Sequence, residues 1–262
     1  MTAAEQSEAA FFDLLDVAGA PRTLVALGGR LDVPTLVAAY RAGCFPWPAS
    51  GRHRRGLDRS ARRLARSGQV PVLPGTDLAA PGLVPWCSPQ PRAVLLADRV
   101  TVSRSLRQQL RRCGWSTTLD AAFDAVVAGC ADRPETWITG DMRRAYGDLH
   151  RAGGAHSVEV WAGRELVGGL YGVLTGRVFS GESMFHRRPG ASKVALVDLC
   201  ARLRESGVAL LDTQQETEHM LSLGQVAVDR GEYVDVVRAL RDAPARLPGG
   251  RRDAAALPLP RR

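Results

Sequence analysis

The sequence has few of the features that mark secreted or membrane proteins. Its five cysteines are scattered with no close pair, which excludes a disulfide framework and a cysteine-rich zinc site. No apolar run is long enough to span a bilayer, so we expect no membrane contact. The first twenty residues hold four carboxylates and no Lys or Arg, unlike the basic start of a signal peptide. We therefore expect a cytoplasmic protein with reduced thiols and no metal.

Lysine is also almost absent, since Lys193 is the only one, yet abundant arginine gives a formal net charge of +8. The positive charge is confined to two segments. Residues 52–66 carry seven Arg and one Asp, and residues 244–262 carry five Arg and one Asp. The rest of the chain has a net charge of −2, so the basicity belongs to these segments and not to the core.

The 262 residues suffice for one large or two modest domains. Residues 1–97 predict a small N-terminal domain. An Arg-rich and then Pro/Gly-rich insertion at 49–85 interrupts it, and we expect this insertion to be mobile apart from one basic helix at 59–66. Residues 98–243 predict the main domain, and the Pro-, Gly- and Arg-rich residues 244–262 predict a disordered tail.

The main domain shows a regular order of helical and extended patterns. Helices are predicted for 103–113, 121–130, 140–152, 191–206 and 231–241, with Ser103, Asp120 and Thr139 as N-caps. Strands are predicted for 92–97, 115–119, 155–161, 165–174, 177–185 and 209–213. Two helices, three meandering strands, a helix, a strand and a helix follow in the order of an acetyltransferase-like (GNAT-type) mixed α/β fold.

Two short polar signatures lie within the apolar strands of this domain. One is Glu182, and the other is the pair Asp212 and Gln214. An ionised carboxylate buried without a partner costs several kcal/mol, so such placements indicate a specific role. Asp212 and Gln214 are two residues apart on a strand and project from one face. A carboxylate can orient the glutamine amide, whose oxygen can then accept a hydrogen bond from an attacking amine.

Each of these residues also has a purely structural interpretation. An Asp/Gln pair near a strand end often makes ordinary end-of-strand hydrogen bonds. Glu182 could instead form a buried ion pair with Arg177 or Lys193. The surrounding motifs decide in favour of a functional interpretation.

Eight motifs follow one another along the chain. They are Ala42–Trp47, Trp86–Leu95, Ser103–Ser105, Thr136–Thr139, Ala155–Trp161, Leu166–Gly172, Gly181–Phe185 and Leu211–Gln214. This ordered set resembles the bacterial leucyl/phenylalanyl-tRNA–protein transferases over about residues 24–48 and 85–240. The resemblance implies transfer of leucine or phenylalanine from aminoacyl-tRNA to proteins that begin with Arg or Lys, which marks them for degradation by the N-end rule. It implies no cofactor, and we expect a monomer.

The resemblance also implies roles for individual residues. Asp212 and Gln214 match the catalytic pair, and Glu182 matches a residue near the acceptor amine. The pocket for the amino-acid side chain is implied at four positions, Leu170, Phe179, Met184 and Leu211.

Contacts with tRNA are implied at two aromatic residues and on two basic helical faces. Trp137 and Trp86 are expected near the nucleic acid, although Cys87 stands where the family has a second Trp. The candidate phosphate contacts are Arg104, Arg107, Arg111, Arg143 and Arg144. The insertion at 49–85 is far longer than the family's usual link, and its charge predicts salt-sensitive tRNA affinity unless it is an unselected insertion.

Two other functions are open at this point. An acyl-CoA-dependent N-acetyltransferase needs a glycine-rich loop for pyrophosphate before the long helix, and Arg187–Ser192 matches that loop only in part because Pro189 lacks an N–H. A non-enzymatic RNA-binding protein would use the Arg-rich segment, but it leaves Glu182, Asp212 and Gln214 without a purpose.

Overall fold

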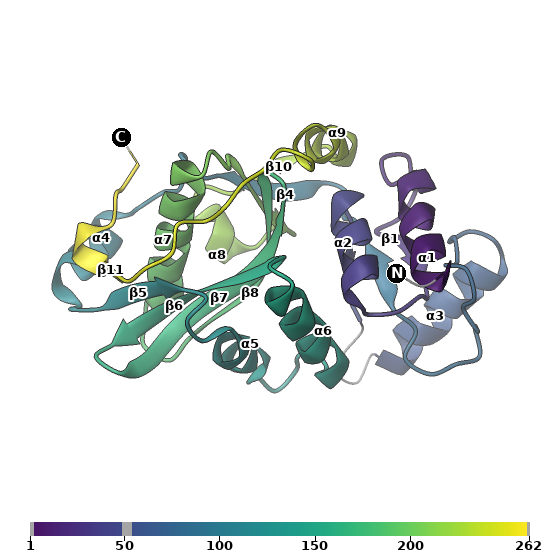
Figure 1. Cartoon of the computed structure of the whole chain (residues 1–262), viewed down its shortest axis with the longest axis horizontal. Helices are drawn as coiled ribbons and strands as arrows, with labels where there is room; N and C mark the ends of the chain where they lie inside the picture. Colours follow the sequence, from purple (N-terminus) through teal and green to yellow (C-terminus); the bar gives the residue numbers. More distant parts are fainter. Residues whose placement is uncertain (1–2, 49–53, 261–262) are drawn as a thin grey trace.

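The computed structural model describes residues 3–48 and 54–260, and two β-sheets organise them (Figure 1). The smaller sheet has three antiparallel strands in the order β1-β3-β2, and helices α1, α2 and α3 lie around it at one end of the molecule. Its elements are α1 (Ala3–Leu14), β1 (Leu24–Leu27), α2 (Val33–Arg41), β2 (Phe45–Pro46), α3 (Arg54–Arg66) and β3 (Pro85–Cys87).

The larger sheet has eight strands in the order β10-β4-β9-β8-β7-β6-β5-β11. Its neighbouring strands are antiparallel except β8 and β9, which run parallel and are joined by the crossover helix α7 that a parallel pair requires. The strands are β4 (Arg92–Leu96), β5 (Ser116–Leu119), β6 (Ala155–Ala162), β7 (Glu165–Thr175), β8 (Val178–His186), β9 (Leu210–Gln214), β10 (Val226–Val228) and β11 (Arg252–Asp253).

Helices cover both faces of the larger sheet. α7 packs on one face, and α5 and α6 pack on the other (Figure 1). Gly168 lets the start of α7 lie against β7, since a Cβ atom there would be 2.6 Å from the Cβ of Ala191. The helices of this part are α4 (Arg104–Arg112), α5 (Phe123–Ala131), α6 (Gly140–Arg151), α7 (Ala191–Glu205), α8 (Glu218–Leu221), α9 (Arg230–Leu240) and the 3₁₀ turn η2 (Ala254–Ala256). Among the described residues, no helix has the length and apolar character needed to cross a membrane.

This arrangement confirms the mixed α/β class, whereas the more specific GNAT-type assignment stays a prediction. The predicted helix at 191–206 is α7, and the predicted strand at 209–213 is β9. The predicted domain boundary at residue 97 does not separate the two sheets, because β4 lies inside the larger sheet between β10 and β9.

One predicted helix cap is wrong. Asp120 has a left-handed backbone, with φ of 60°, and its carboxylate is used elsewhere. It accepts a 2.8 Å hydrogen bond from the backbone N–H of Ser157 and lies 2.7 Å from the imidazole of His156. Helix α5 therefore starts after Ala122, and no side chain of the N-cap residue accepts a hydrogen bond from its first turn.

The described part of the insertion is packed, which corrects the prediction of a mobile segment. Its arginine-rich stretch forms the helix α3, and Ala65 and Val70 are buried with Leu27 of β1 in a small apolar cluster. Apolar residues that recur on one side of an otherwise basic helix give it a face to bury. Residues 49–53 of the predicted insertion lie outside the described residues.

The prediction of a disordered tail is wrong for residues 244–260. β11 pairs with β5 and forms the edge of the larger sheet, and Leu247 and Leu257 are buried in the core that contains α7. The buried Arg202 of α7 donates hydrogen bonds of 3.1 and 3.0 Å to the carbonyl oxygens of Gly249 and Gly250. Composition indicated disorder, but two leucines and a buried cation hold this segment against the sheet.

Candidate active site

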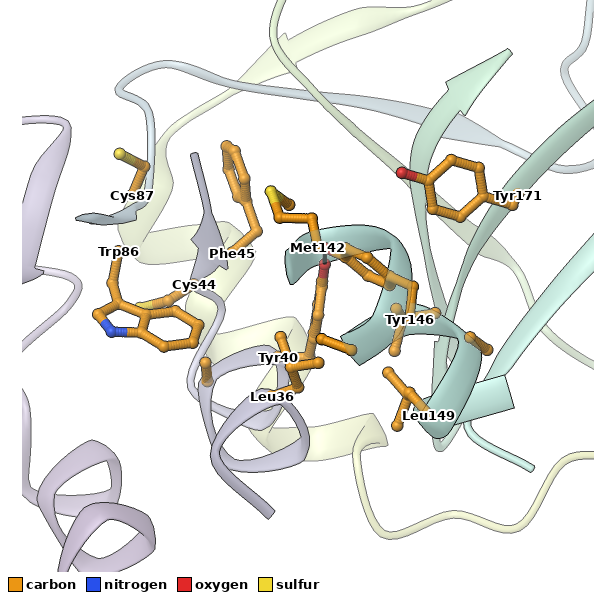
Figure 2. Packing of buried hydrophobic residues seen from close by; sticks show 14 of the residues in the cluster. Leu36, Tyr40, Cys44, Phe45, Trp86, Cys87, Met142, Tyr146, Leu149 and Tyr171 are labelled. Atoms are coloured by element: carbon orange, nitrogen blue, oxygen red, sulfur yellow. Dashed lines mark hydrogen bonds between the residues drawn. The ribbon is translucent and has the colours of Figure 1, made fainter. Parts of the chain in front are cut away.

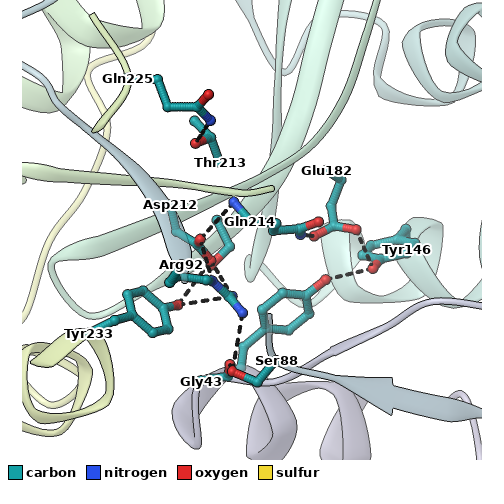
Figure 3. Close-up of polar contacts among 12 residues, drawn as sticks. Gly43, Ser88, Arg92, Tyr146, Glu182, Asp212, Thr213, Gln214, Gln225 and Tyr233 are labelled. Carbon is teal, nitrogen blue, oxygen red and sulfur yellow. Dashed lines mark hydrogen bonds and ion pairs between the residues drawn. The ribbon is translucent and has the colours of Figure 1, made fainter. Parts of the chain in front are cut away.

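The polar residues singled out in the sequence meet where two strands of the larger sheet separate. β8 and β9 pair as far as Ser180 opposite Asp212. Glu182 and Gln214 lie two residues further along these strands, and their side chains are in contact there. The Nε2 of Gln214 donates a hydrogen bond of 2.6 Å to the Oε1 of Glu182 (Figure 3).

Asp212 is fully buried and saturated with hydrogen bonds. Arg92 of β4 donates to both carboxylate oxygens, from Nε to Oδ1 at 2.8 Å and from Nη2 to Oδ2 at 2.7 Å. The hydroxyls of Tyr233 and Ser180 donate to Oδ2 at 2.9 and 3.1 Å, and the backbone N–H of Gln214 donates to Oδ1 at 2.9 Å. An ionised carboxylate has about four lone-pair positions. Asp212 therefore holds its neighbours in place and has no acceptor left for a substrate.

The charge of Arg92 is fixed by this pairing. Burial alone would lower the pKa of Arg92, but the Asp212 carboxylate raises it above its ordinary value. The guanidinium also lies 4.4 Å from the ring centre of Tyr233 and 5.0 Å from that of Phe45. Because a buried ion pair is stable only when both partners are present, the pair ties β4 to β9 beside the site.

Glu182 is buried and binds neutral groups instead of a cation. Tyr146 of α6 donates its hydroxyl to the Oε2 of Glu182 at 2.8 Å. The hydroxyl of Tyr40, on α2, lies 2.6 Å from that of Tyr146, so the network reaches the helices of the smaller sheet (Figure 2). Among the described residues, no ion pair joins Glu182 to Arg177 or Lys193, so the structural interpretation of Glu182 as a buried ion pair is wrong.

This environment raises the pKa of the Glu182 carboxyl to about 7. Burial is the largest cause. The hydroxyls of Tyr40 and Tyr146 and the amide of Gln214 favour the charged form and lower the pKa, whereas the Asp212 carboxylate raises it. A carboxyl with a pKa near neutrality can take up and release a proton at pH 7.

Gln214 has an uncommon backbone conformation, with φ of 66°. Residues other than glycine rarely adopt this left-handed backbone conformation, and the strain is typically about 1–3 kcal/mol. The hydrogen bond from its N–H to Asp212 holds the conformation. Within the described part of the chain, the Oε1 of Gln214 accepts no hydrogen bond, so that oxygen is available to a bound molecule.

An apolar cavity of about 220 Å³ opens beside Glu182, between the separating strands, α7 and α8. Three of the four predicted pocket residues line it, namely Leu170, Met184 and Leu211. The sequence did not point to the other apolar lining residues, which are Leu196, Leu199 and Met220.

The fourth predicted pocket residue, Phe179, does not line this cavity. Its side chain is fully buried in the hydrophobic core, and it lies close to Gly172 of β7, where an added Cβ would approach its ring to 2.4 Å. Phe179 therefore supports the sheet and does not face the cavity. The alternation of the strand could not distinguish a core position such as Phe179 from a cavity-lining position such as Met184, since both carry apolar side chains.

A second cavity, of about 580 Å³, lies between the smaller sheet, α3 and the segment before α6. Trp137 lines it together with Trp47. Trp86 does not, because it is fully buried against Phe12 and its Nε1–H donates a 2.9 Å hydrogen bond to the carbonyl of Gly28. Trp86 therefore has no face open to a nucleotide. Trp47, which was not predicted, is the indole that lines this cavity together with Trp137.

The predicted phosphate-binding arginines fall into two separate groups. Arg143 and Arg144 are exposed on α6 and line a hollow of about 450 Å³. Arg104, Arg107 and Arg111 belong to α4, which lies at the opposite end of the molecule from α3 (Figure 1). Their contact with RNA stays a prediction.

Sequence reasoning missed several residues of the site. Arg92 could have been found, because a buried Asp212 requires a cation and Arg92 begins a predicted strand. Tyr40 and Tyr146 had no such signal. They are 106 residues apart, and only the packing of α2 against α6 brings their hydroxyls together.

Comparison with known proteins agrees with this arrangement. The family model for leucyl/phenylalanyl-tRNA protein transferase matches residues 94–238, and the model for the N-terminal domain of that transferase matches residues 29–54. A leucyl/phenylalanyl-tRNA–protein transferase from Pseudomonas aeruginosa (strain LESB58) is 44% identical over 228 residues, which cover 86% of this chain and 88% of the relative. Proteins of the same name from Pseudomonas fluorescens (strain Pf0-1) and Ectopseudomonas mendocina (strain ymp) are 42% and 40% identical, with the same coverage of both chains. The chain therefore belongs to the leucyl/phenylalanyl-tRNA protein transferase family and is a transferase enzyme.

Proposed function

We propose that this protein transfers leucine or phenylalanine from aminoacyl-tRNA to the N-terminal amine of proteins that begin with Arg or Lys, which marks them for degradation by the N-end rule. The observation that carries the proposal is the position of the Glu182–Gln214 pair. The pair lies at the edge of an apolar cavity of about 220 Å³. Such a cavity suits a side chain without polar groups, such as that of Leu or Phe.

The donor's amino-acid side chain enters this cavity, whose walls are apolar at Leu170, Met184 and Leu211. The acyl carbon then lies near Glu182, which lines the same cavity. Burial of the apolar side chain favours Leu and Phe over polar amino acids, because a polar group would lose water there without gaining a partner.

The reaction forms a bond between the acceptor nitrogen and the acyl carbon and breaks the bond between that carbon and the 3′ oxygen of the tRNA. An aminoacyl ester is already activated, and positioning alone can contribute about 7–11 kcal/mol. The Oε1 of Gln214 accepts a hydrogen bond from the attacking amine. Glu182 takes up the amine proton and returns it to the departing 3′ oxygen. Asp212 acts as a positioning residue that fixes the Gln214 backbone.

The acceptor's cationic residue has a source of complementary charge nearby. Thr217 and His219 line the cavity, and their sequence neighbours Glu216 and Glu218 are exposed to solvent. Asp212 does not contribute, because Arg92 neutralises it. Two exposed carboxylates favour a partner with a positively charged N-terminal side chain.

The acetyltransferase alternative is not supported by the start of α7. There the Nε2 of Gln109 donates a 2.6 Å hydrogen bond to the carbonyl of Pro189, and an added Cβ at Gly190 would lie 2.1 Å from the Gln109 Oε1. The Gln109 amide thus covers the helix N-terminus on which a pyrophosphate would bind. The non-enzymatic alternative gives no role to the Glu182–Gln214 pair.

A donor and acceptor panel tests the proposal. Purified protein is offered Leu-tRNA, Phe-tRNA or acetyl-CoA together with peptides that begin with Arg, Lys or Glu, and products are identified by mass spectrometry. We expect leucyl or phenylalanyl addition to the Arg and Lys peptides only. Acetylated peptide, or equal labelling of the Glu peptide, contradicts the proposal.

A further inference from the structure

The cavity that Trp47 and Trp137 line has a wall that lies outside the residues matched by the family models. These models match residues 29–54 and 94–238, so nearly all of α3 lies outside both. Leu57, Ala61 and Leu64 of α3 nevertheless line the cavity opposite Trp47 and Trp137. The insertion therefore supplies one wall of the cavity that Trp47 and Trp137 line.

The other side of the same helix is strongly basic. Arg55, Arg59, Arg63 and Arg66 recur every three or four residues, so they form one stripe, and all four are exposed. None of them forms an ion pair with another residue in the described ranges 3–48 and 54–260. Arg62 lies off the stripe and has a structural task, since it donates a 2.7 Å hydrogen bond to the Ala80 carbonyl.

The indole cavity is close to the proposed transfer site. Arg133 lines the cavity beside Glu182, and Trp137 lines the cavity beside α3. Trp137 follows Arg133 by four positions in the chain, so their Cα atoms are at most about 14 Å apart. The aminoacyl group and the nucleotides of one donor molecule can therefore occupy both cavities together.

We infer that α3 is a binding element for the single-stranded 3′ end of the aminoacyl-tRNA, and this inference rests on the proposed function. Bases stack on aromatic surfaces, and arginines contact the phosphates of the strand, which is the usual combination for single-stranded nucleic acid. Trp47 and Trp137 provide the stacking surfaces, α3 closes the cavity with its apolar side, and the arginine stripe contacts phosphates as the strand passes over the helix.

The test replaces all four stripe arginines with glutamine (R55Q/R59Q/R63Q/R66Q). A matched control replaces four exposed arginines elsewhere (R164Q/R177Q/R188Q/R238Q). Binding of a fluorescent uncharged tRNA is titrated over a range of salt concentrations, and thermal unfolding confirms that both variants fold. For single-stranded nucleic acid, each lost phosphate contact makes the slope of log affinity against log salt concentration less steep by about 0.7. We therefore expect the slope of the stripe variant to be less steep by about 3 and its affinity to be at least about tenfold lower. The control should keep the wild-type slope.

Transfer kinetics provide the second measurement. With Leu-tRNA, the stripe variant should show a KM raised about tenfold or more and kcat within about twofold of wild type. With 3′-leucyl-adenosine, which has no phosphate, it should equal wild type.

Three results decide the matter. Equal salt slopes for the stripe variant and the control overturn the inference. Loss of transfer from leucyl-adenosine in a folded stripe variant also overturns it, because α3 would then act on the reaction and not on phosphates. If wild type transfers leucine from neither donor, the proposed function fails, and the salt slope still decides whether α3 binds RNA.

Discussion

Gln214 donates its amide hydrogen to Glu182 across the point where β8 and β9 separate, at 2.6 Å between Nε2 and Oε1. This single contact fixes which end of the amide faces a substrate. Rotating the amide would bring two oxygens together, so the Oε1 of Gln214 is held as an acceptor beside the cavity. A glutamine fixed in this way can orient an amine without itself changing charge.

Gln214→Ala should lower kcat/KM by at least about a hundredfold, because it removes the acceptor for the attacking amine. Gln214→Gly is the matched variant, since it also removes the side chain but relieves the left-handed backbone at φ of 66°. We expect both to be inactive and the glycine variant to be more stable than the alanine variant by about 1 kcal/mol. Single-turnover transfer and urea unfolding measure the two effects. Near-normal transfer by either variant contradicts the role of the amide oxygen.

Glu182 should make the free energy of unfolding fall as pH rises. Its pKa is about 7 in the folded protein, above its ordinary value of 4.5, so the folded protein binds the proton more tightly than the unfolded chain. The stabilisation that protonated Glu182 gives the folded protein is therefore fully present below about pH 4.5 and is lost as pH rises to about 7. The free energy of unfolding should change by about 3 kcal/mol over this range. Urea unfolding at several pH values, compared with Glu182→Gln, measures it. Parallel pH profiles for the two proteins would contradict the raised pKa.

Arg92→Met should destabilise the protein by about 3–5 kcal/mol, because it leaves the Asp212 carboxylate buried without a cation. The double variant Arg92→Met with Asp212→Leu should recover most of this loss, yet stay inactive because the Gln214 backbone loses its acceptor. Arg238→Met, which removes an exposed ion pair, should cost less than about 1 kcal/mol. Denaturant unfolding of the three proteins provides the comparison. A double variant no more stable than Arg92→Met alone would show that the ion pair is not the source of the loss.

Leu170→Phe should narrow the cavity and lower transfer of Phe relative to Leu by about tenfold or more. Phe179→Leu is the control, since Phe179 is buried outside the cavity lining. We expect that variant to lose stability while the ratio of kcat/KM for the two donors stays the same. Competition between Phe-tRNA and Leu-tRNA measures the ratio. A changed ratio in the Phe179 variant would return that residue to the pocket.

Glu216→Gln combined with Glu218→Gln should raise the KM for an Arg-starting peptide by about fivefold to tenfold, because it removes two exposed carboxylates that adjoin the cavity-lining residues Thr217 and His219 in sequence. The KM for Leu-tRNA should stay the same or fall. The effect should also weaken at high salt, since exposed charges are screened. If the KM for the peptide is unaffected at low salt, the acceptor's cation is bound elsewhere.

Sequence patterns predicted the part of this structure that depends on local periodicity. The alternating strands of the larger sheet and the helix α7 follow directly from their residues. Glu182, Asp212 and Gln214 were also grouped correctly, because the parallel pair β8 and β9 places equivalent positions side by side. The partners of these residues were not predictable in the same way. Tyr233 reaches Asp212, and Tyr40 reaches the Glu182 network, only through packing between helices that no local pattern specifies.

The errors have a common physical origin. Trp86 and Trp47 are both aromatic residues within family-like motifs, but only burial distinguishes the core indole from the one that lines a cavity. In the same way, the composition of residues 244–260 indicates disorder, whereas Leu247 and Leu257 pack on the core and Arg202 binds the backbone of the segment. Such outcomes depend on the space that the rest of the fold leaves open.

The most direct test of the central claim is single-turnover transfer of labelled leucine from Leu-tRNA to a peptide that begins with Arg, by wild type, Glu182→Gln and Gln214→Ala. We predict rapid label transfer to the peptide's N-terminus by wild type, and a loss of at least about a hundredfold in each variant while Leu-tRNA binding is kept. Wild-type transfer that both folded variants retain would contradict the account, because the Glu182–Gln214 pair would then have no part in the reaction.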